Sequence, residues 1–413
     1  MRDSLAQSGS LLFCDLTQSW SEFGGGVGTY LRRKRDHIVS NTPHRHLLIV
    51  PGVEDSAREN GRAITVTIAS PAVPSSPNYR LLLRNGAVRE ALERFRPDLV
   101  ECQDGYNLPW AALSYRKRHP SVAVTAIYMT DFPTAYVHRP LKPIIGDTIA
   151  KQLRSLAYRY CGFLYRRFDT VIALGEHGGA AKLRQLGVGN VEIVPLGVEI
   201  DEFSPRNHDP QLRQSLGLSD GEPLLIYVGR LDQERRAELV VDAFRKLPAA
   251  LGARLALIGE GPIRDSILES GDARVIAPGY LTDRSELARW LASADIYVSA
   301  MADETFGVSV IEAQASGLPV VGVAAGGMLD RVDRETGRLG PVDDCKTMAA
   351  NILDVWDSDC AAMGLAARAH VEGRFSWDRT FHALFREVYP RAIESRAELQ
   401  AGVAATFARS PAA

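Results

Sequence analysis

The sequence predicts an α/β protein of two domains, each built on a parallel sheet. Short apolar segments of strand type alternate with helical segments along the whole chain, which is the pattern of βαβ units. The chain has 413 residues, more than one hydrophobic core usually supports. The alternation restarts after a stretch rich in proline and glycine at residues 194–205, which has the composition of a linker.

The expected strands are short and apolar on both faces, as in parallel sheets that helices cover. In the first half they lie near Leu11–Leu16, His46–Val50, Ile64–Ile68, Leu99–Cys102, Val122–Tyr128, Thr170–Leu174 and Ile193–Pro195. The helices expected between them cover Val27–Ser40, Tyr79–Phe95, Pro109–Arg118, Pro143–Arg167 and Glu176–Gln185. The second half has expected strands at Leu224–Val228, Arg254–Ile258, Val275–Ala277, Asp295–Ser299 and Val320–Val323.

The most informative segment runs from Glu304 to Glu312, between two apolar strands. It places two carboxylates eight residues apart around the turn Phe306-Gly307-Val308. A helix that begins near Gly307 leaves Glu304 in the loop and places Glu312 further along the helix. In βαβ units small ligands lie beyond the carboxyl ends of the strands, against helix N-termini. We therefore expect the two acids to contact different parts of one elongated ligand.

Two arginines follow a buried strand of the second half. Arg230 comes directly after Tyr227-Val228-Gly229, and Arg235 lies five residues further on. Arginine binds phosphate oxygens through two parallel hydrogen bonds. The pair can therefore neutralise one diphosphate.

The segment from Glu304 resembles the E-x7-E signature of retaining glycosyltransferases with the GT-B fold, most closely family 4. Glu304, Phe306-Gly307-Val308 and Glu312 match that signature residue by residue. The resemblance implies two Rossmann-like domains whose parallel sheets face each other across a cleft. It also implies that Glu304 contacts the donor sugar, that Phe306, Gly307 and Val308 lie near the phosphates, and that Glu312 binds the ribose.

Further donor contacts follow from the same resemblance. Arg230 matches the family pattern G-R-L-x-x-E-K-G, whereas Arg235 stands where lysine is usual and Arg236 replaces a glycine. The family pattern places Arg230 and Arg235 on the donor diphosphate. The resemblance to the family also places the turn Gly279-Tyr280 beside the nucleobase, so Tyr280 is a candidate wall of the base pocket. We expect no metal ion and no cofactor besides the nucleotide sugar, because the arginines neutralise the diphosphate.

Two features in the first half of the chain, a glycine turn and a missing histidine, are relevant to the reaction. Gly25 and Gly26 match the family's G-G-x-x-x-Y turn after the first strand, where glycine lets the backbone approach a ligand closely. Many relatives carry a histidine near the reacting sugar where this chain has Met129, which transfers no proton. Three alternatives remain open. The backbone carbonyl at this turn suffices, Asp131 or His138 substitutes, or the protein binds a nucleotide sugar without turning it over.

The expected catalytic residues are therefore Glu304, Arg230, Arg235 and Asp131. Residues 1–197 are expected to form an N-terminal acceptor domain and residues 198–376 a nucleotide-sugar donor domain. The resemblance also implies a terminal helix at residues 377–393 that crosses back to the first domain. We expect the alanine-rich residues 394–413 to fray.

The two halves of the chain carry opposite charge. Residues 1–200 hold 25 Lys and Arg against 18 Asp and Glu, while residues 201–413 hold 23 against 32. A basic first domain, with clusters such as Arg32-Arg33-Lys34-Arg35, suggests an anionic partner. Residues 151–167 interleave basic with apolar side chains, as in a helix that lies on an anionic membrane surface. The alternative is a solvated helix whose apolar side packs inside its own domain.

Composition excludes other classes of protein. The sequence contains no run of 18 apolar residues, and its five cysteines are scattered without metal-ligand spacing. Nucleic acid is not an expected partner, because no binding motif accompanies the charge. We expect a cytoplasmic protein, at the inner face of the membrane if its acceptor is a lipid.

Together these patterns predict a retaining glycosyltransferase that moves a hexosyl unit from a UDP- or GDP-sugar to an acceptor hydroxyl, in glycolipid or polysaccharide synthesis. A sugar-nucleotide epimerase of the same fold is the rival enzyme, but it needs dedicated acids and histidines. The non-enzymatic alternative is a partner subunit that binds a nucleotide sugar, and Met129 is the only residue that supports it.

Overall fold

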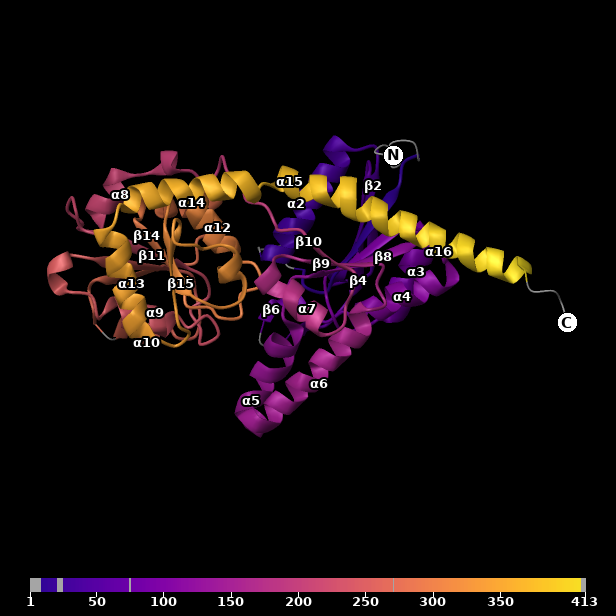
Figure 1. The fold of residues 1–413 in the computed structure, drawn as a ribbon, viewed down its shortest axis with the longest axis horizontal. Helices are drawn as coiled ribbons and strands as arrows, with labels where there is room; N and C mark the ends of the chain where they lie inside the picture. Colours follow the sequence, from indigo (N-terminus) through magenta and orange to yellow (C-terminus); the bar gives the residue numbers. More distant parts are fainter. Residues whose placement is uncertain (1–8, 21–24, 74–75, 270, 410–413) are drawn as a thin grey trace. The chain divides into compact units, whose positions relative to one another are not determined.

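The structure is a computed structural model that describes residues 9–20, 25–73, 76–269 and 271–409 (Figure 1). The chain forms two compact units. The first contains the chain up to Leu174, then Gly179–Val194, and the C-terminal segment from Thr380 onward; the second contains Gly175–Gly178 and Pro195–Arg379. Each unit has one mainly parallel sheet covered by helices, so the predicted α/β class is confirmed.

The sheet of the first unit has the strand order β10-β9-β8-β7-β1-β2-β4-β3 and is parallel except for the edge strand β3. Its strands are β1 (Leu12–Leu16), β2 (Arg45–Gly52), β3 (Ser56–Asn60), β4 (Ala63–Ala69), β7 (Leu99–Cys102), β8 (Ala123–Tyr128), β9 (Thr170–Ala173) and β10 (Val191–Ile193). A small hairpin is formed by β5 (Ala72–Val73) and β6 (Ser76–Arg80). The central strands β1, β7, β8 and β9 are buried along their whole length, because helices cover both faces.

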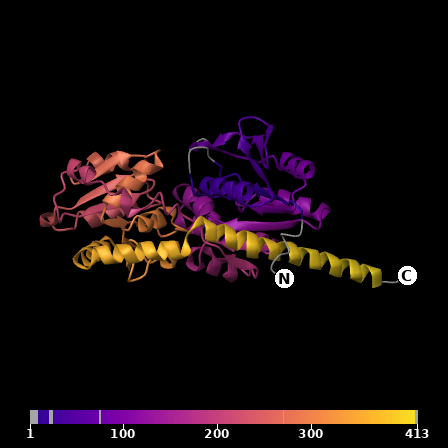
Figure 2. The same ribbon diagram turned by 90° about the horizontal axis from the view of Figure 1, so that it is seen from above.

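The helices of the first unit include the last segment of the chain. They are α2 (Gly26–Asn41), α3 (Asn85–Phe95), α4 (Leu108–Arg118), η1 (Pro133–His138), α5 (Arg139–Ile145), α6 (Asp147–Tyr165), α7 (Ala181–Gln185), η6 (Leu384–Val388) and α16 (Tyr389–Arg409). Figure 2 shows α16, in yellow, running along this unit. The helix continues to Arg409, whereas the sequence analysis expected residues from 394 to fray. Alanine has the highest helix propensity, so an alanine-rich tail can extend a helix that is already anchored.

The sheet of the second unit is entirely parallel, with the order β13-β12-β11-β14-β15-β16. Its strands are β11 (Leu224–Val228), β12 (Arg254–Ile258), β13 (Val275–Gly279), β14 (Ile296–Val298), β15 (Val320–Val323) and β16 (Gly337–Gly340). Its helices are η3 (Pro205–Asn207), α8 (Pro210–Ser215), α9 (Ala237–Phe244), η4 (Ala249–Leu251), α10 (Arg264–Glu269), α11 (Arg284–Ser293), α12 (Val308–Ala315), η5 (Gly326–Asp330), α13 (Cys345–Asp357) and α14 (Cys360–Arg374). The helix α15 (Trp377–Ala383) begins in this unit and ends in the first, while η2 (Glu176–Ala180) spans the boundary near residue 178.

A cluster of buried charges lies within the first unit. The Lys34 ammonium on α2 lies 2.7 Å from Asp15 Oδ1 and 2.9 Å from Glu101 Oε1, and all three side chains are shielded from solvent. His46 Nε2 lies 2.7 Å from the other oxygen of Asp15. Lys34 therefore adds nothing to the basic surface that its sequence neighbours suggested. A buried charge is tolerated when it is paired, and here one cation serves two carboxylates.

The C-terminal helix completes this cluster. The Tyr389 hydroxyl at the start of α16 donates to Glu101 Oε2 at 2.8 Å, and the Tyr30 hydroxyl on α2 donates to Glu101 Oε1 at 2.8 Å. Phe13 on β1 packs against Tyr389, with their ring centroids 5.5 Å apart. The end of the chain is thus built into the core of the first unit.

Among the residues that the structure describes, no helix is both long enough and apolar enough to cross a membrane.

Candidate functional site

The order of the strands identifies an edge of the second sheet where a ligand can bind. Strand order runs β13-β12-β11 in one direction and β14-β15-β16 in the other, so it reverses between β11 and β14. In open parallel sheets the crevice at the carboxyl ends of two such strands is the usual ligand site. The loop after β11 carries Arg230 and Arg235, and the loop after β14 carries Glu304 and Gly307. The topology therefore brings these four of the predicted donor residues to one edge.

Arg235 and Glu304 meet across this edge. Arg235 NH1 lies 3.8 Å from Glu304 Oε2. The Arg235 backbone amide also donates to Asp232 Oδ1 at 2.9 Å, which fixes the loop after β11. Burial opposes the charge of Arg235, but Glu304 and the nearby tyrosines outweigh it and raise the pKa of the guanidinium above its ordinary value. Arg235 is therefore a permanent cation at this edge, beside the Glu304 carboxylate.

Arg230 is placed differently from Arg235. Its side chain is 68% exposed and lies 3.3 Å from Asp232 through Nε, while its carbonyl accepts a hydrogen bond from the Tyr227 hydroxyl at 2.7 Å. The backbone is held and the guanidinium projects into solvent, where it can rotate onto an anion.

Glycines allow the loops after β11 and β12 to lie against each other. A Cβ atom on Gly259 would lie 1.9 Å from the Gly229 carbonyl oxygen, and one on Gly261 would lie 2.1 Å from the Leu231 carbonyl oxygen. The Gly229 amide donates to the Ile258 carbonyl at 3.0 Å. Side chains at these two positions would push the loop after β12 away from the loop after β11, which carries both arginines.

The helix α12 begins where the sequence predicts. Gly307 precedes it with φ 86° and ψ 63°, a left-handed conformation that favours glycine, and no side chain caps the helix. The first turn is held by the buried Tyr297, whose hydroxyl lies 2.8 Å from Ser309 Oγ. The amides at Val308 and beyond are therefore positioned to bind an anion. The Phe306 ring is buried under the Arg331 guanidinium at 4.1 Å, so Phe306 can offer a ligand only its backbone.

Glu312 is buried on α12 and has a partner that the sequence analysis missed. Arg284 NH2, at the start of α11, lies 2.9 Å from Glu312 Oε1. Burial raises the pKa of Glu312 to about 7, although Arg284 acts in the opposite direction. The two residues are 28 positions apart, and no local pattern links them. Burial in the folded unit therefore opposes ionisation of this carboxyl group.

Tyr280 follows β13 and its side chain is 59% exposed. The neighbouring Gly279 has φ 96°, and its carbonyl accepts a hydrogen bond from the Gly259 amide at 2.9 Å. The turn is therefore fixed to the loop after β12, whereas the tyrosine ring projects from it. A role in binding a base stays a prediction.

The remaining predicted residues lie in the first unit. Gly25 has φ 94° and precedes α2, whose N-terminus has no side-chain cap, and both Gly25 and Gly26 are exposed. Met129 is buried beyond the carboxyl end of β8. His138 Nε2 lies 3.2 Å from Asp147 Oδ1 at the start of α6, so its ring is held by that hydrogen bond.

Asp131 has several donors around one carboxylate oxygen. Its Oδ2 accepts hydrogen bonds from the Tyr158 hydroxyl at 2.6 Å and from Thr134 at 3.2 Å, and it pairs with Lys182. Burial alone would raise the pKa of Asp131, but Lys182 and the hydroxyls lower it below its usual range. Asp131 is therefore an ionised, firmly held carboxylate.

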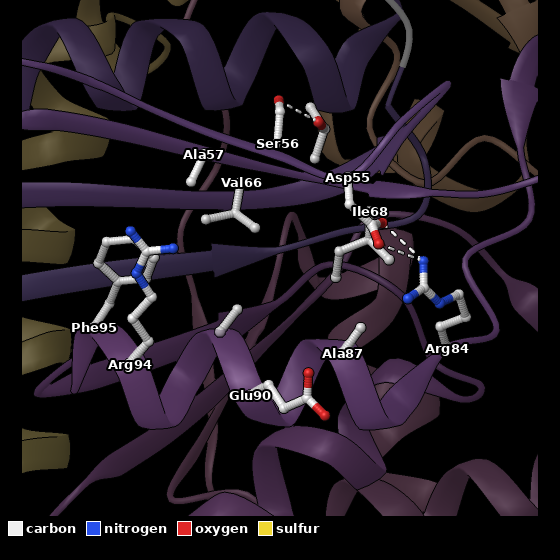
Figure 3. Close-up of a pocket in the computed structure, with 12 residues that line it drawn as sticks. Asp55, Ser56, Ala57, Val66, Ile68, Arg84, Ala87, Glu90, Arg94 and Phe95 are labelled. Carbon is white, nitrogen blue, oxygen red and sulfur yellow. Dashed lines mark hydrogen bonds and ion pairs between the residues drawn. The ribbon is translucent and has the colours of Figure 1, made fainter.

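A cavity of about 420 Å³ lies in the first unit, between α3 and the strands β3 and β4 (Figure 3). Val66 and Ile68 line it from the sheet and Ala87 and Phe95 line it from α3, and an ion pair of 2.7 Å between Arg84 and Asp55 stands at one end. None of the catalytic or donor-binding residues predicted from the sequence lines this cavity.

Comparison with known proteins gives the family. The model of "Glycosyltransferase Family 4" matches residues 24–202, and that of "Glycosyl transferases group 1" matches residues 222–358. A GDP-mannose-dependent alpha-(1-6)-phosphatidylinositol dimannoside mannosyltransferase of Mycobacterium tuberculosis is 30% identical over 321 residues, which are 76% of this chain and 79% of that protein. The chain belongs to glycosyltransferase family 4. A sulfoquinovosyl transferase of Arabidopsis thaliana is 31% identical to this family 4 chain over 383 residues, covering 88% of it and 69% of the plant protein.

Solved structures agree on the fold of this family 4 glycosyltransferase. A sucrose-phosphate synthase from Thermosynechococcus elongatus has a TM-score of 0.73 at 19% identity and covers 92% of this chain and 99% of its own. The Anabaena protein HepE, solved with UDP and glucose, has a TM-score of 0.68 at 16% identity, with 92% and 99% covered. The GT-B fold and the glycosyltransferase class that the sequence predicted are confirmed.

Proposed function

We propose that this glycosyltransferase is a retaining enzyme that transfers a hexosyl unit from a nucleotide diphosphate sugar to a hydroxyl of a lipid-linked acceptor. The observation that carries the proposal is the pair Arg235 and Glu304, 3.8 Å apart, beside the uncapped N-terminus of α12. A GDP-hexose, mannose above all, is the preferred donor, because the mycobacterial relative is named as GDP-mannose-dependent.

The departing nucleoside diphosphate requires the greatest stabilisation in such a reaction. Arg235 supplies a fixed cation at the edge of the sheet, and the exposed Arg230 can rotate onto the same phosphates. The amides of the first turn of α12 add the positive end of the helix dipole. Positive groups that are fixed before reaction stabilise the charge as it develops on the leaving oxygen. We therefore expect the enzyme to need no metal ion.

The two glutamates serve the two ends of the donor. Glu304 is held by Arg235, so its carboxylate is suited to accept hydrogen bonds from sugar hydroxyls rather than to attack carbon. Glu312 would accept from the ribose hydroxyls. Because Glu304 is paired with Arg235 and is not placed as a nucleophile, we propose that retention comes from an acceptor that attacks on the face the diphosphate leaves.

The acceptor is assigned to the first unit. A lipid is favoured because the mycobacterial relative is named as a phosphatidylinositol dimannoside mannosyltransferase, and because this unit is basic. Asp131, ionised beside Lys182, would orient the attacking hydroxyl in place of the histidine that Met129 replaces. We place the enzyme in the cytoplasm, at the inner face of the membrane.

Nucleotide binding tests the donor assignment first. The melting temperature of the pure protein is measured with GDP, UDP, ADP and CMP, each with and without EDTA. A ligand at 100 times its dissociation constant stabilises the folded state by about 2.7 kcal/mol, which raises the midpoint by at least a few degrees. A shift with GDP that survives EDTA supports the proposal. No shift with any nucleotide would reject it.

A matched pair of arginine variants then tests the site. Arg235→Met should remove most of the GDP response and of sugar transfer. Arg236→Gly is the control, because Arg236 pairs with Asp343 at 2.7 Å and has φ 52°, where glycine is favoured. The anomeric configuration of the product, read by NMR, decides between retention and inversion.

A further inference from the structure

The helices α5 and α6 form a hairpin on the first unit. They pack against each other and against η1, and Gly146, with φ 81°, turns the chain between them. Figure 1 shows the pair, in magenta, extending past the end of the sheet. The sequence of this stretch fits both apolar side chains that pack inside the domain and apolar side chains that face a membrane.

The outer side of α6 is apolar. Ile149, Leu156 and Phe163 have exposed fractions of 52%, 59% and 46%, and Ile144 on α5 is 76% exposed. The three residues of α6 follow one another at intervals of seven, close to two helical turns. They therefore form one line along the helix.

Packing within the first unit accounts for the opposite side of α6. Ala150, Cys161 and Leu164 are buried, and Cys161 and Leu164 belong to the core of this unit. The helix thus has an inner apolar face that is packed and an outer apolar line that stays about half exposed, although Phe163 also contacts the Trp110 ring. Internal packing, the first alternative, explains only the inner face.

The hairpin is also strongly basic. Residues 139–167 contain seven Lys and Arg against one acid, a net charge of +6. That acid, Asp147, is already paired with Lys151 at 2.6 Å and with His138 at 3.2 Å. Arg159 lies three residues after Leu156 and four before Phe163, on the outer side, and forms no ion pair with a carboxylate of the described residues. The Arg167 guanidinium lies over the Phe163 ring at 3.5 Å.

We infer that the outer face of the α5–α6 hairpin docks the first unit onto an anionic lipid surface. Ile149, Leu156 and Phe163 enter the boundary between headgroups and acyl chains, while Arg159 and Arg166 remain at the phosphates. A second copy of the chain is a poorer partner, because it would bring one +6 surface against another. The role of this docking, which is to bring a lipid acceptor to the enzyme, rests on the proposed function. Binding to the lipid surface itself requires no nucleotide sugar.

Sedimentation with vesicles tests the inference. Wild-type protein should sediment with vesicles of phosphatidylcholine and phosphatidylglycerol, less at high salt, and should stay in solution with phosphatidylcholine alone. L156Q/F163Q should weaken binding by at least about tenfold, since both side chains lose their place in the apolar layer. R159Q/R166Q should weaken it by about fivefold for each arginine.

Control variants remove equivalent groups elsewhere. Leu365→Gln removes a side chain that is 68% exposed on α14, and R58Q/R386Q removes two exposed arginines from the same unit as the hairpin. These proteins should bind vesicles like the wild type, and unchanged melting midpoints show that every variant is folded. Equal binding by all variants would overturn the inference, as would a wild type that ignores phosphatidylglycerol. Conversion of a wild-type dimer to a monomer by L156Q/F163Q would instead assign this face to contact between copies.

The docking and the proposed function can fail separately. A protein that sediments with vesicles but transfers no sugar would leave the inference standing and reject the function. Transfer to a lipid-linked acceptor dissolved in detergent, by a protein that does not bind vesicles, would reject the inference and leave the function standing.

Discussion

Replacing the buried Glu312 by glutamine should change how the stability of the second unit depends on pH. Burial raises the pKa of this carboxyl group to about 7 from an ordinary 4.5, despite the hydrogen bond from Arg284. The protonated form is therefore favoured in the folded protein. Its contribution to folding is complete below about pH 4.5 and is lost as the pH rises through about 7.

The size of the effect follows from the two pKa values. The interval between 4.5 and about 7 corresponds to on the order of 3 kcal/mol of unfolding free energy. Glutamine has nearly the shape of the protonated acid and cannot ionise. The Glu312→Gln protein should thus lie within about 1 kcal/mol of the wild type at pH 5 and become more stable than the wild type by up to about 3 kcal/mol at pH 8.

Urea unfolding at pH 5, 6, 7 and 8 measures this difference, with hydrogen exchange of peptides from residues 195–379 to isolate the second unit. Glu335→Gln, which alters an exposed glutamate of the same unit, serves as the control and should show no such trend. If the wild type and Glu312→Gln respond to pH identically, Glu312 is ionised throughout and the argument from burial is refuted.

Three further substitutions have defined outcomes. Gly259→Ala places a Cβ against the Gly229 carbonyl, at 1.9 Å, and should cost the second unit about 1–3 kcal/mol and weaken nucleotide binding, as read by urea unfolding and calorimetry. Lys34→Met leaves two buried carboxylates without their cation and should destabilise the first unit by about 3–5 kcal/mol, a loss that should shrink at low pH where the acids are protonated. Tyr389→Phe removes a hydroxyl that donates to Glu101 and should cost the first unit about 1–3 kcal/mol, while the nucleotide-induced melting shift is unchanged.

Most of the fold could be predicted because parallel strands buried on both faces have a plain signal. The apolar segments that become β1, β8 and β11 were recognised nearly to their ends. The strands β3 and β16 could not be predicted in this way. The first is an exposed edge strand, and the second, Gly337–Gly340, contains only one large apolar residue.

Helix boundaries were less predictable where glycine or a turn intervenes. The expected helix Tyr79–Phe95 is shorter, because α3 starts only at Asn85 and Tyr79 belongs to the strand β6. The expected helix Pro143–Arg167 is two helices that turn at Gly146. A periodic pattern of side chains does not reveal such breaks.

In the candidate site, local motifs could be predicted from the sequence, whereas contacts between residues far apart in the chain could not. The position of Gly307 before α12 followed from the sequence, because a glycine turn after a strand has a local signature. The pairing of Arg284 with Glu312 did not, because the residues come from different helices and meet only in the folded unit. The left-handed φ of 52° at Arg236 explains why related sequences can have glycine there.

The hydrogen bond from Tyr389 to Glu101 has a consequence for synthesis of the protein. The second unit is nearly continuous in sequence, whereas the first needs a segment that begins at Thr380. On the ribosome, the N-terminal strands emerge first but wait for the last helices before Glu101 gains its final donor. The second unit can therefore finish folding before the first. A first unit produced alone would need the segment from Thr380 supplied, fused or in trans, to close its core.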